Sequence, residues 1–279
     1  MNGKHLLLAT LALTFTAAAG HAAEPPTDSG RPIVIGRSYT LHSKVLGGQR
    51  RINIYLPPGY SDVKRRFPVL YLLDGGQAED FHHITGLVQV AAFNGKTQEL
   101  LVVGIEGVDR KHDLTHPSKV PRDLQTLPTS GGSAAYRRFL TEELKPWVEA
   151  RYRTTGRTAL IGESLAGLFV TETFLRAPRS FDDYIAISPS LWWGDEGLSR
   201  EAEADLRSGD FRGRHLYLSI GDEGGEMRTG VDRLVQALKS EALEGLDWRF
   251  DPRPEERHDT IYHPAALTAI RTLFPVPDR

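Results

Sequence analysis

The chain has 279 residues, of which 40% are hydrophobic and 25% charged, a balance that is typical of a globular protein and excludes a disordered or fibrous one. Its 34 basic and 36 acidic residues give a formal net charge of -2 without a long run of one sign, so neither nucleic acid nor an anionic membrane surface is an expected partner. Cysteine is absent, which excludes disulfide bonds and thiolate chemistry.

The N-terminus has the pattern of a signal peptide. A short basic start leads into the apolar run 6–19, which is too short to span a bilayer, and the small residues that follow favour cleavage after Ala22, with Ala23 as the neighbouring choice. A buried core helix is the alternative, but the position at the extreme N-terminus favours export. We therefore expect residues 1–22 to be removed, the protein to be periplasmic or secreted, and residues 23–279 to form a single domain.

The next part of the chain predicts an antiparallel hairpin, because residues 33–45 and 51–56 alternate apolar with polar side chains on either side of Gly47-Gly48. The later apolar runs are continuous, as in strands that are buried on both faces of a parallel sheet. These runs predict strands at residues 68–73, 100–105, 158–161, 184–187 and 216–220, and a last strand around 248–250.

Helical patterns lie between the strands, at residues 133–152, 165–175, 230–243 and 264–273. Ser133 is the expected N-cap of the first of these helices, and Pro264 opens the last one at a favoured first position. The alternation of strand and helix predicts one α/β domain with a mostly parallel central sheet, an N-terminal antiparallel hairpin and helices on both faces.

The segment Gly162-Glu163-Ser164-Leu165-Ala166 lies between a short apolar strand and an amphipathic helix. This is the context of a nucleophile elbow, a tight turn in which small flanking residues let a serine hydroxyl project above the sheet. Ala166 replaces the usual second glycine, and we expect its methyl group to be tolerated. A helix N-cap is the alternative interpretation of Ser164. We predict that Ser164 is the nucleophile of an α/β-hydrolase.

Several stretches of the chain stand in a characteristic order, namely residues 70–75, 122–124, 139–146 with 152–154, 161–169 and 185–193. Together they resemble the Putative esterase family, which includes esterase D-like and ferric-siderophore esterases, and the resemblance extends over about residues 35–275. It implies an α/β-hydrolase that cleaves ester or thioester bonds without a cofactor.

A serine hydroxyl needs a base to remove its proton, and histidine can do this near neutral pH. In α/β-hydrolases the order along the chain is nucleophile, acid, histidine, which leaves His215, His258 and His263. His215 opens a predicted strand, and His263 precedes Pro264 as the expected cap of the last helix. His258 falls in the loop before that helix, where the family places its base. We expect His258 to be the base, with His263 as the alternative.

The acid is expected in the loop after the strand at 216–220, which offers Asp222, Glu223 and Glu226. Relatives often carry a glutamate shortly after the first glycine of this loop, so we choose Glu223, with Glu226 and then Asp222 as alternatives. The family's own column falls on Gly224 here. A Ser-His dyad is therefore a further alternative, because some siderophore-esterase relatives work without the acid.

The oxyanion of the reaction needs backbone N–H donors. The first is expected from Leu165, which follows the nucleophile, and the second from the loop after the strand at 68–73. In that loop Gly76 is our choice and Gln77 the alternative, because glycine lets the backbone approach a substrate closely. An ordinary glycine turn is the other interpretation of this loop.

Three side chains are candidates for substrate binding. Trp192 and Trp193 follow the strand at 184–187 and are expected at the carboxyl edge of the sheet, where ligands bind in open α/β folds. Packing beneath a loop is the alternative for both. Arg122 is a candidate electrostatic contact for an acidic substrate.

We expect no metal site. His112 and His116 are four residues apart, but the residues around them indicate a loop and not a helix. His82 and His83 are expected at the start of a helix near the pocket.

The sequence therefore predicts an exported serine hydrolase that cleaves a small-molecule carboxylic ester through an acyl-enzyme, with no cofactor, no nucleic acid and no membrane span. Siderophore lactones, short acyl esters, and feruloyl or acetyl groups on carbohydrates are the candidate substrates. An acyltransferase would use the same residues, and a catalytically silent binding protein on the same fold is the alternative from another class. The oligomeric state is not indicated by the sequence.

Overall fold

The computed structural model describes residues 31–276. The described residues from Ile35 onward form one compact unit. The predicted signal peptide, residues 1–22, lies outside the described residues, and the assignment of 23–279 to a single domain stays a prediction. Within residues 31–276, no helix is both long enough and apolar enough to cross a membrane.

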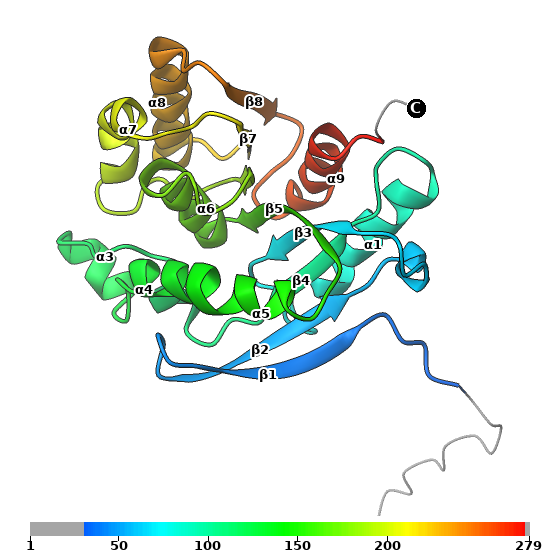
Figure 1. The fold of residues 1–279 in the computed structure, drawn as a ribbon. Helices are drawn as coiled ribbons and strands as arrows, with labels where there is room; N and C mark the ends of the chain where they lie inside the picture. Colours follow the sequence, from blue (N-terminus) through cyan, green and yellow to red (C-terminus); the bar gives the residue numbers. More distant parts are fainter. Residues whose placement is uncertain (1–30, 277–279) are drawn as a thin grey trace, which may run out of the picture. The chain divides into compact units, whose positions relative to one another are not determined.

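An eight-stranded sheet runs through the unit (Figure 1). The strand order is β1-β2-β4-β3-β5-β6-β7-β8, in which β1 with β2 and β2 with β4 are antiparallel and the other neighbours are parallel. The predicted hairpin and mostly parallel sheet are thus confirmed. The strands are β1 (Arg37–Ser43), β2 (Gly48–Tyr55), β3 (Phe67–Leu72), β4 (Leu101–Ile105), β5 (Thr154–Glu163), β6 (Asp183–Ile187), β7 (Arg214–Gly221) and β8 (Leu246–Arg253).

The continuous apolar runs belong to the strands that are covered on both faces. Every residue of β3, β4 and β6 is buried. The edge strand β8 instead alternates between half-buried and exposed residues, because it has a neighbour on one side alone. The parallel strands all end at one edge of the sheet, and the loops that follow β5, β6, β7 and β8 meet there.

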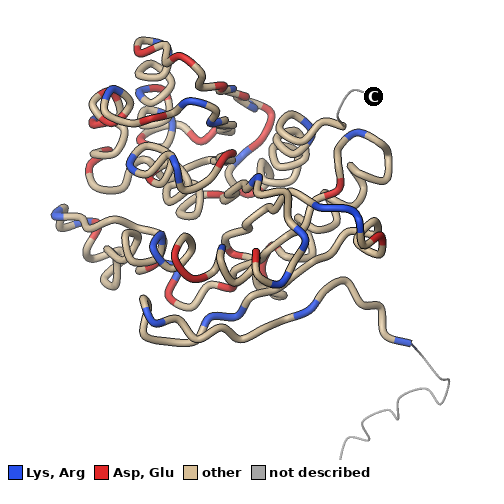
Figure 2. The backbone as a smooth tube through the Cα atoms, in the orientation of Figure 1, with Lys and Arg blue, Asp and Glu red and all other residues tan. Residues whose placement is uncertain are grey.

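Helices cover both faces of the sheet, as predicted (Figure 1). On one face α1 and α9 share an apolar cluster with the strands, and on the other face α4 to α8 share a second cluster. Acidic and basic residues are interspersed along α7 and α8 (Figure 2). The helices are α1 (Phe81–Phe93), α2 (Arg110–Asp113), α3 (Pro121–Thr126), α4 (Ser133–Arg138), α5 (Lys145–Glu149), α6 (Leu165–Arg176), α7 (Gly197–Ser208), α8 (Gly225–Glu241) and α9 (Tyr262–Leu273), with a 3-10 turn η1 (Pro58–Ser61) and a π-helical turn η2 (Phe139–Leu144).

Several helix boundaries differ from the predictions. The helix predicted at 133–152 is a continuous run of α4, η2 and α5, and Gly132 occupies its N-cap position instead of Ser133. Helix α8 begins before residue 230, and α9 begins at Tyr262, so that Pro264 is its third residue. A proline in the first turn is tolerated because the N–H groups of that turn have no partner within the helix.

Candidate active site

Ser164 stands at the turn where β5 ends and α6 begins. Its backbone has φ 59° and ψ -119°, a conformation that residues other than glycine rarely adopt. Its N–H donates to the carbonyl oxygen of Ile187 at 3.1 Å, which ties the turn to the end of β6. Although Ser164 occupies the N-cap position of α6, its side chain makes no capping hydrogen bond. The turn therefore leaves the serine hydroxyl available for other contacts.

The residues around this turn are small because strand and helix touch behind it. A Cβ atom on Gly162 would lie 2.6 Å from the Cβ atom of Ala166, and one on Gly167 would lie 2.8 Å from the carbonyl oxygen of Ile187. Ala166 itself is fully buried. The methyl group of Ala166 fits at this position because residue 162 is glycine.

Gly162→Ala is expected to lower the free energy of unfolding by about 1–3 kcal/mol, because two methyl groups would compete for one space. Urea unfolding followed by tryptophan fluorescence measures the change. Adding Ala166→Gly should recover part of the loss. Gly86→Ala in α1 is the matched control, since a Cβ atom there meets nothing within 4 Å. Unchanged stability of Gly162→Ala would contradict this account of the turn.

His258 and Glu223 form the hydrogen bond that defines the site. His258 lies between β8 and α9, and its Nδ1 atom is 2.8 Å from Oε2 of Glu223, which follows β7. The other carboxylate oxygen, Oε1, accepts hydrogen bonds from the Ser188 hydroxyl and, at 3.3 Å, from the Gly221 N–H. The Glu223 side chain is 4% exposed and that of His258 45%. An ionised carboxylate makes Nδ1 the donor and leaves Nε2 of His258 as a free acceptor.

The charges of this pair stabilise one another. The hydrogen bond to Glu223 raises the pKa of His258 above its usual value, against the opposing effect of burial. Burial would raise the pKa of Glu223, but the hydrogen bonds from His258 and Ser188 together lower it. A second carboxylate, Glu163, lies nearby, and burial raises its pKa to about 7. Glu163 also contributes to the raised pKa of His258.

Three of the four remaining candidates for base and acid have other partners. His215 faces Asp183 on the neighbouring strand at 2.9 Å. His263 does not cap α9 but lies inside its first turn, where its ring stacks on that of His83 with the ring centroids 5.2 Å apart. Glu226 forms an ion pair with Arg122. Asp222 lines the same cavity as His258 but makes no hydrogen bond to it within the described part of the chain.

A cavity of about 590 Å³ brings the reactive groups together. Ser164, Leu165, Glu223 and His258 all line it, although no hydrogen bond joins Ser164 to His258 within residues 31–276. The Ser164 hydroxyl contacts instead the hydroxyl of Ser190, at 3.3 Å between the oxygens. In unliganded enzymes the bond between nucleophile and base is often long and shortens in the substrate complex.

The three predicted substrate contacts are not equivalent in the structure. Trp192 lines the cavity. Trp193 is fully buried, and its indole N–H donates to the carbonyl oxygen of His116 at 2.8 Å, so it packs beneath the loop. Arg122 does not line the cavity, because its guanidinium donates two hydrogen bonds to Glu226 on the surface.

Arg110 is one of two arginines that line the cavity, the other being Arg257, and the sequence revealed neither as a candidate. Its Nε and Nη2 atoms bind the carboxylate of Asp74, and Nη2 also donates to the Glu163 carbonyl oxygen at 3.3 Å. Its Nη1 atom has no partner within the described residues. The ion pair with Asp74, which follows β3, fixes the guanidinium beside the turn that carries Ser164.

The two expected oxyanion donors differ as well. Leu165 lines the cavity and is the first residue of α6, so its N–H has no acceptor within the helix. The N–H of Gly76 is already engaged, because it donates to Oε2 of Glu79 at 2.7 Å. Gly76 is therefore not available as the second donor in this structure.

Comparison with known proteins identifies the family. The family model described as Putative esterase matches residues 43–248. The ferri-bacillibactin esterase BesA of Bacillus subtilis is 34% identical over 227 residues, which cover 74% of this chain and 78% of that protein. The chain belongs to this family. It is a serine ester hydrolase, as the sequence predicted.

The solved structures of the esterase family agree with the fold. An IroE-like serine hydrolase from Shewanella oneidensis superimposes with a TM-score of 0.78 at 28% identity, covering 86% of this chain and 80% of that one. The BES protein of Bacillus cereus gives a TM-score of 0.75 at 24% identity, covering 89% and 99% of the two chains. The esterase therefore has the α/β-hydrolase fold.

Two of the histidines considered as metal ligands, His112 and His83, make hydrogen bonds to carboxylates of this esterase. His112 lies in the short helix α2, which the sequence did not predict, and contacts Asp113. His116 is buried beside Glu172, and burial lowers its pKa. His83 lies in the first turn of α1, as expected, and contacts Asp80. No group of three His, Cys, Asp or Glu side chains suited to a metal ion occurs in the described residues.

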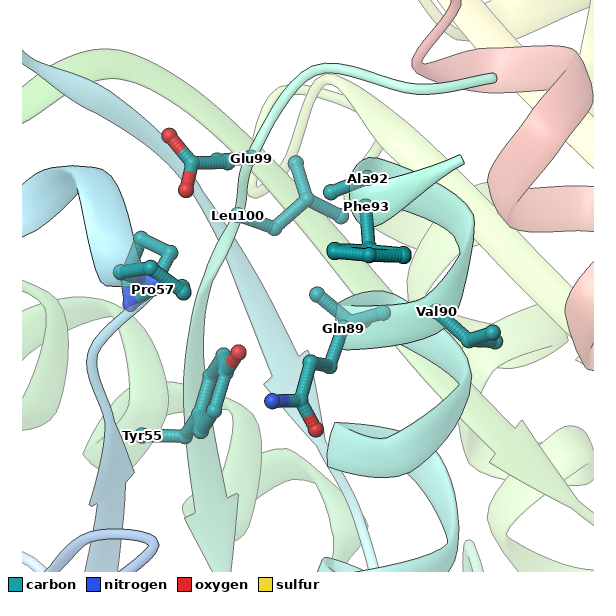
Figure 3. Close-up of a pocket in the computed structure, with 10 residues that line it drawn as sticks. Tyr55, Pro57, Gln89, Val90, Ala92, Phe93, Glu99 and Leu100 are labelled. Atoms are coloured by element: carbon teal, nitrogen blue, oxygen red, sulfur yellow. The ribbon is translucent and has the colours of Figure 1, made fainter. Parts of the chain in front are cut away.

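A second cavity of the esterase, of about 360 Å³, lies between η1, α1 and the segment before β4 (Figure 3). Tyr55, Gln89 and Glu99 contribute polar atoms to walls that are otherwise largely apolar. Neither serine nor histidine lines this cavity, so it offers no pair of nucleophile and base. Of these two cavities, the one around Ser164 is lined by both serine and histidine.

Proposed function

We propose that this esterase acts through Ser164 as nucleophile, His258 as general base and Glu223 as the acid that orients His258. The observation that supports the proposal is the His258–Glu223 hydrogen bond of 2.8 Å in the cavity that also holds Ser164 at its strained turn. A carboxylate on Nδ1 fixes the tautomer of the imidazole and stabilises its protonated form, which is what a general base requires.

The proposed reaction has two steps. Ser164 Oγ attacks the ester carbonyl carbon while Nε2 of His258 takes the hydroxyl proton. The bond between the carbonyl carbon and the alcohol oxygen then breaks, and the alcohol leaves with that proton. Water next gives a proton to His258 and attacks the acyl group, and the carboxylic acid leaves as the Ser164 hydroxyl is restored. The Leu165 N–H is positioned to stabilise the oxyanion of both intermediates.

The proposed substrates are esters or lactones of iron-chelating siderophores. This proposal follows the names of the relatives, which include the ferri-bacillibactin esterase and an iron(III) salmochelin esterase of Escherichia coli that is 24% identical over 224 residues. The cavity supports it in two ways. Its volume of about 590 Å³ accepts a sizeable acyl group, and Arg110 offers a free Nη1 atom to an anionic group beside the ester.

We also propose that the enzyme is exported and meets its substrate in the periplasm or outside the cell. The proposal rests on the signal-peptide pattern of residues 1–22 and on the absence of cysteine from the chain. A protein without cysteine can fold after export by core burial, with no dependence on disulfide formation.

A substrate panel tests the proposed function. Purified enzyme should hydrolyse ferric and iron-free catecholate trilactones with higher kcat/KM than p-nitrophenyl acetate or a feruloyl sugar, with hydrolysis measured by chromatography of the products. Arg110→Gln should reduce the preference for the anionic substrates, and Arg122→Gln, outside the cavity, is the matched control. A higher kcat/KM for feruloyl sugars than for the trilactones would contradict the proposed siderophore substrate and would indicate a feruloyl esterase. Release of an acyl-sugar in the presence of a sugar acceptor would indicate an acyltransferase.

A further inference from the structure

The segment Ser188-Pro189-Ser190, directly after β6, lies between the two ends of the proposed catalytic group. The Ser188 side chain is fully buried, and Ser190 is 3% exposed. The hydroxyl of Ser188 binds the proposed acid, and the hydroxyl of Ser190 contacts the proposed nucleophile. Two hydroxyls of one short segment thus reach Glu223 and Ser164.

The contact of Ser188 completes the coordination of the Glu223 carboxylate. His258 binds Oε2, while the Ser188 hydroxyl and the Gly221 N–H bind Oε1. Both oxygens are therefore held, and the carboxylate cannot rotate about its last bond without breaking a hydrogen bond. A buried carboxylate that is held at both oxygens keeps a fixed direction toward its histidine.

Ser190 holds the proposed nucleophile, Ser164, in place. Its N–H donates to the carbonyl oxygen of Ser164 at 3.0 Å, and its hydroxyl oxygen lies 3.3 Å from that of Ser164. Backbone and side chain of Ser190 thus both touch the residue that stands at the strained turn. This contact restricts the rotation of the Ser164 side chain before substrate enters.

The spacer between the two hydroxyls is rigid. Pro189 has a fixed φ, and it packs so closely on α6 that a Cβ atom on Gly167 would lie 3.0 Å from its Cα atom. Ser188 has φ 41°, in the left-handed region, and its N–H donates to the carbonyl oxygen of Ser219 at 2.8 Å. The segment is therefore anchored to β7 on one side and to α6 on the other.

We propose that Ser188 and Ser190 are positioning residues, which set the direction of the Glu223 carboxylate and of the Ser164 hydroxyl through one rigid segment. The proposal rests on the proposed roles of Ser164, His258 and Glu223. It assigns a catalytic purpose to the left-handed backbone of Ser188, because that conformation turns the hydroxyl toward Glu223.

Ser188→Gly is the variant that tests the first contact. Glycine adopts φ 41° without strain, so the variant loses the hydroxyl while the segment keeps its backbone. We expect kcat for p-nitrophenyl acetate to fall about tenfold with little change in KM, because the loss affects orientation and not binding. The melting temperature should not fall. Unchanged kcat in the folded variant would overturn the role of Ser188.

A double-mutant cycle with Glu223→Ala separates positioning from a merely structural effect. If Ser188 acts through Glu223, Ser188→Gly should reduce kcat about tenfold in the wild type and less than about twofold in Glu223→Ala. An equal loss in both backgrounds would show that Ser188 acts by another route, and would reject the proposal while leaving the proposed function intact.

Ser190→Ala tests the second contact by the rate of labelling with a fluorophosphonate probe. We expect the second-order rate constant to fall about threefold to tenfold, since the Ser164 hydroxyl loses its fixed direction. Ser219→Ala is the matched control, because Ser219 is equally buried but donates to the backbone of Asp251 at 2.7 Å. Equal or faster labelling of Ser190→Ala would overturn the role of Ser190. Labelling of Ser164→Ala would instead reject the proposed function.

Discussion

Ser164→Ala should lower kcat for ester hydrolysis about 10^4- to 10^6-fold and abolish labelling by a fluorophosphonate probe. The reason is that the substitution removes the hydroxyl that carries the acyl group in the proposed reaction, and the neighbouring Ser190, which is 3% exposed, does not stand at the elbow. Some turnover should remain, because the Leu165 N–H and the cavity still act on bound substrate. Stopped assays with a p-nitrophenyl ester measure kcat, and intact-mass spectrometry measures labelling.

The substitution tests the nucleophile with little effect on folding, because the hydroxyl of Ser164 caps no helix and its contact within the described residues is the 3.3 Å approach to the Ser190 hydroxyl. Ser164→Ala should therefore keep the melting temperature of the wild type, and the strained φ of 59° should remain. A variant that is folded and still labelled by the probe would show that another serine is the nucleophile. An inactive wild-type protein that resists labelling would favour the silent binding protein.

His258→Ala is expected to reduce kcat by a similar factor of about 10^4 to 10^6, because His258 is the histidine among the described residues that line the cavity. Glu223→Ala should cost less, about 10^2- to 10^4-fold, since it removes the orientation of the base and leaves the base itself. His263→Ala is the control, because its ring stacks on His83. Loss of activity in His263→Ala together with full activity in His258→Ala would transfer the base to His263.

The pH dependence provides a second measurement of the same residue. A general base must be neutral, so kcat/KM should rise with pH and level off above the pKa of His258, which its bond to Glu223 raises above 6.5. Glu163, with a pKa raised to about 7, titrates in the same range, so Glu163→Gln should move the acid limb to lower pH by removing a negative charge that faces His258. In Glu223→Ala the limb should also move to lower pH. A limb that is unaffected by both substitutions would belong to another group.

The strands and the elbow follow from sequence because they depend on local patterns. Continuous apolar runs indicate strands buried on both faces, and β3, β4 and β6 are buried throughout. The sequence also required small residues at Gly162 and Ala166, and the close approach of β5 and α6 explains both. Such patterns involve residues that are close together in the sequence. They can therefore be recognised without knowing the tertiary structure.

The pairing of charged side chains could not be predicted in the same way. Arg122 in α3 and Glu226 in α8 are 104 residues apart, and only the tertiary structure reveals that the two side chains form an ion pair. Arg110 lies in the cavity because Asp74 holds it there, again across distant segments. Glu79 engages the N–H of Gly76 through a turn whose geometry is not apparent from its glycines. The tertiary structure thus determines which carboxylate, cation or backbone amide has no protein partner and can contact a substrate.

The proposed base lies beside an edge strand of the sheet, and this position affects how the enzyme loses activity on partial unfolding. His258 lies in the loop that follows β8, and within the described residues this strand pairs with β7 alone and has no buried residue. Edge elements of this kind open locally at a lower free energy than the buried centre of a sheet. Ser164, in contrast, is anchored between strands that are covered on both faces. We therefore expect mild denaturation to reduce catalytic activity before it disrupts the core, because the loop that holds the proposed base can open while Ser164 stays in place.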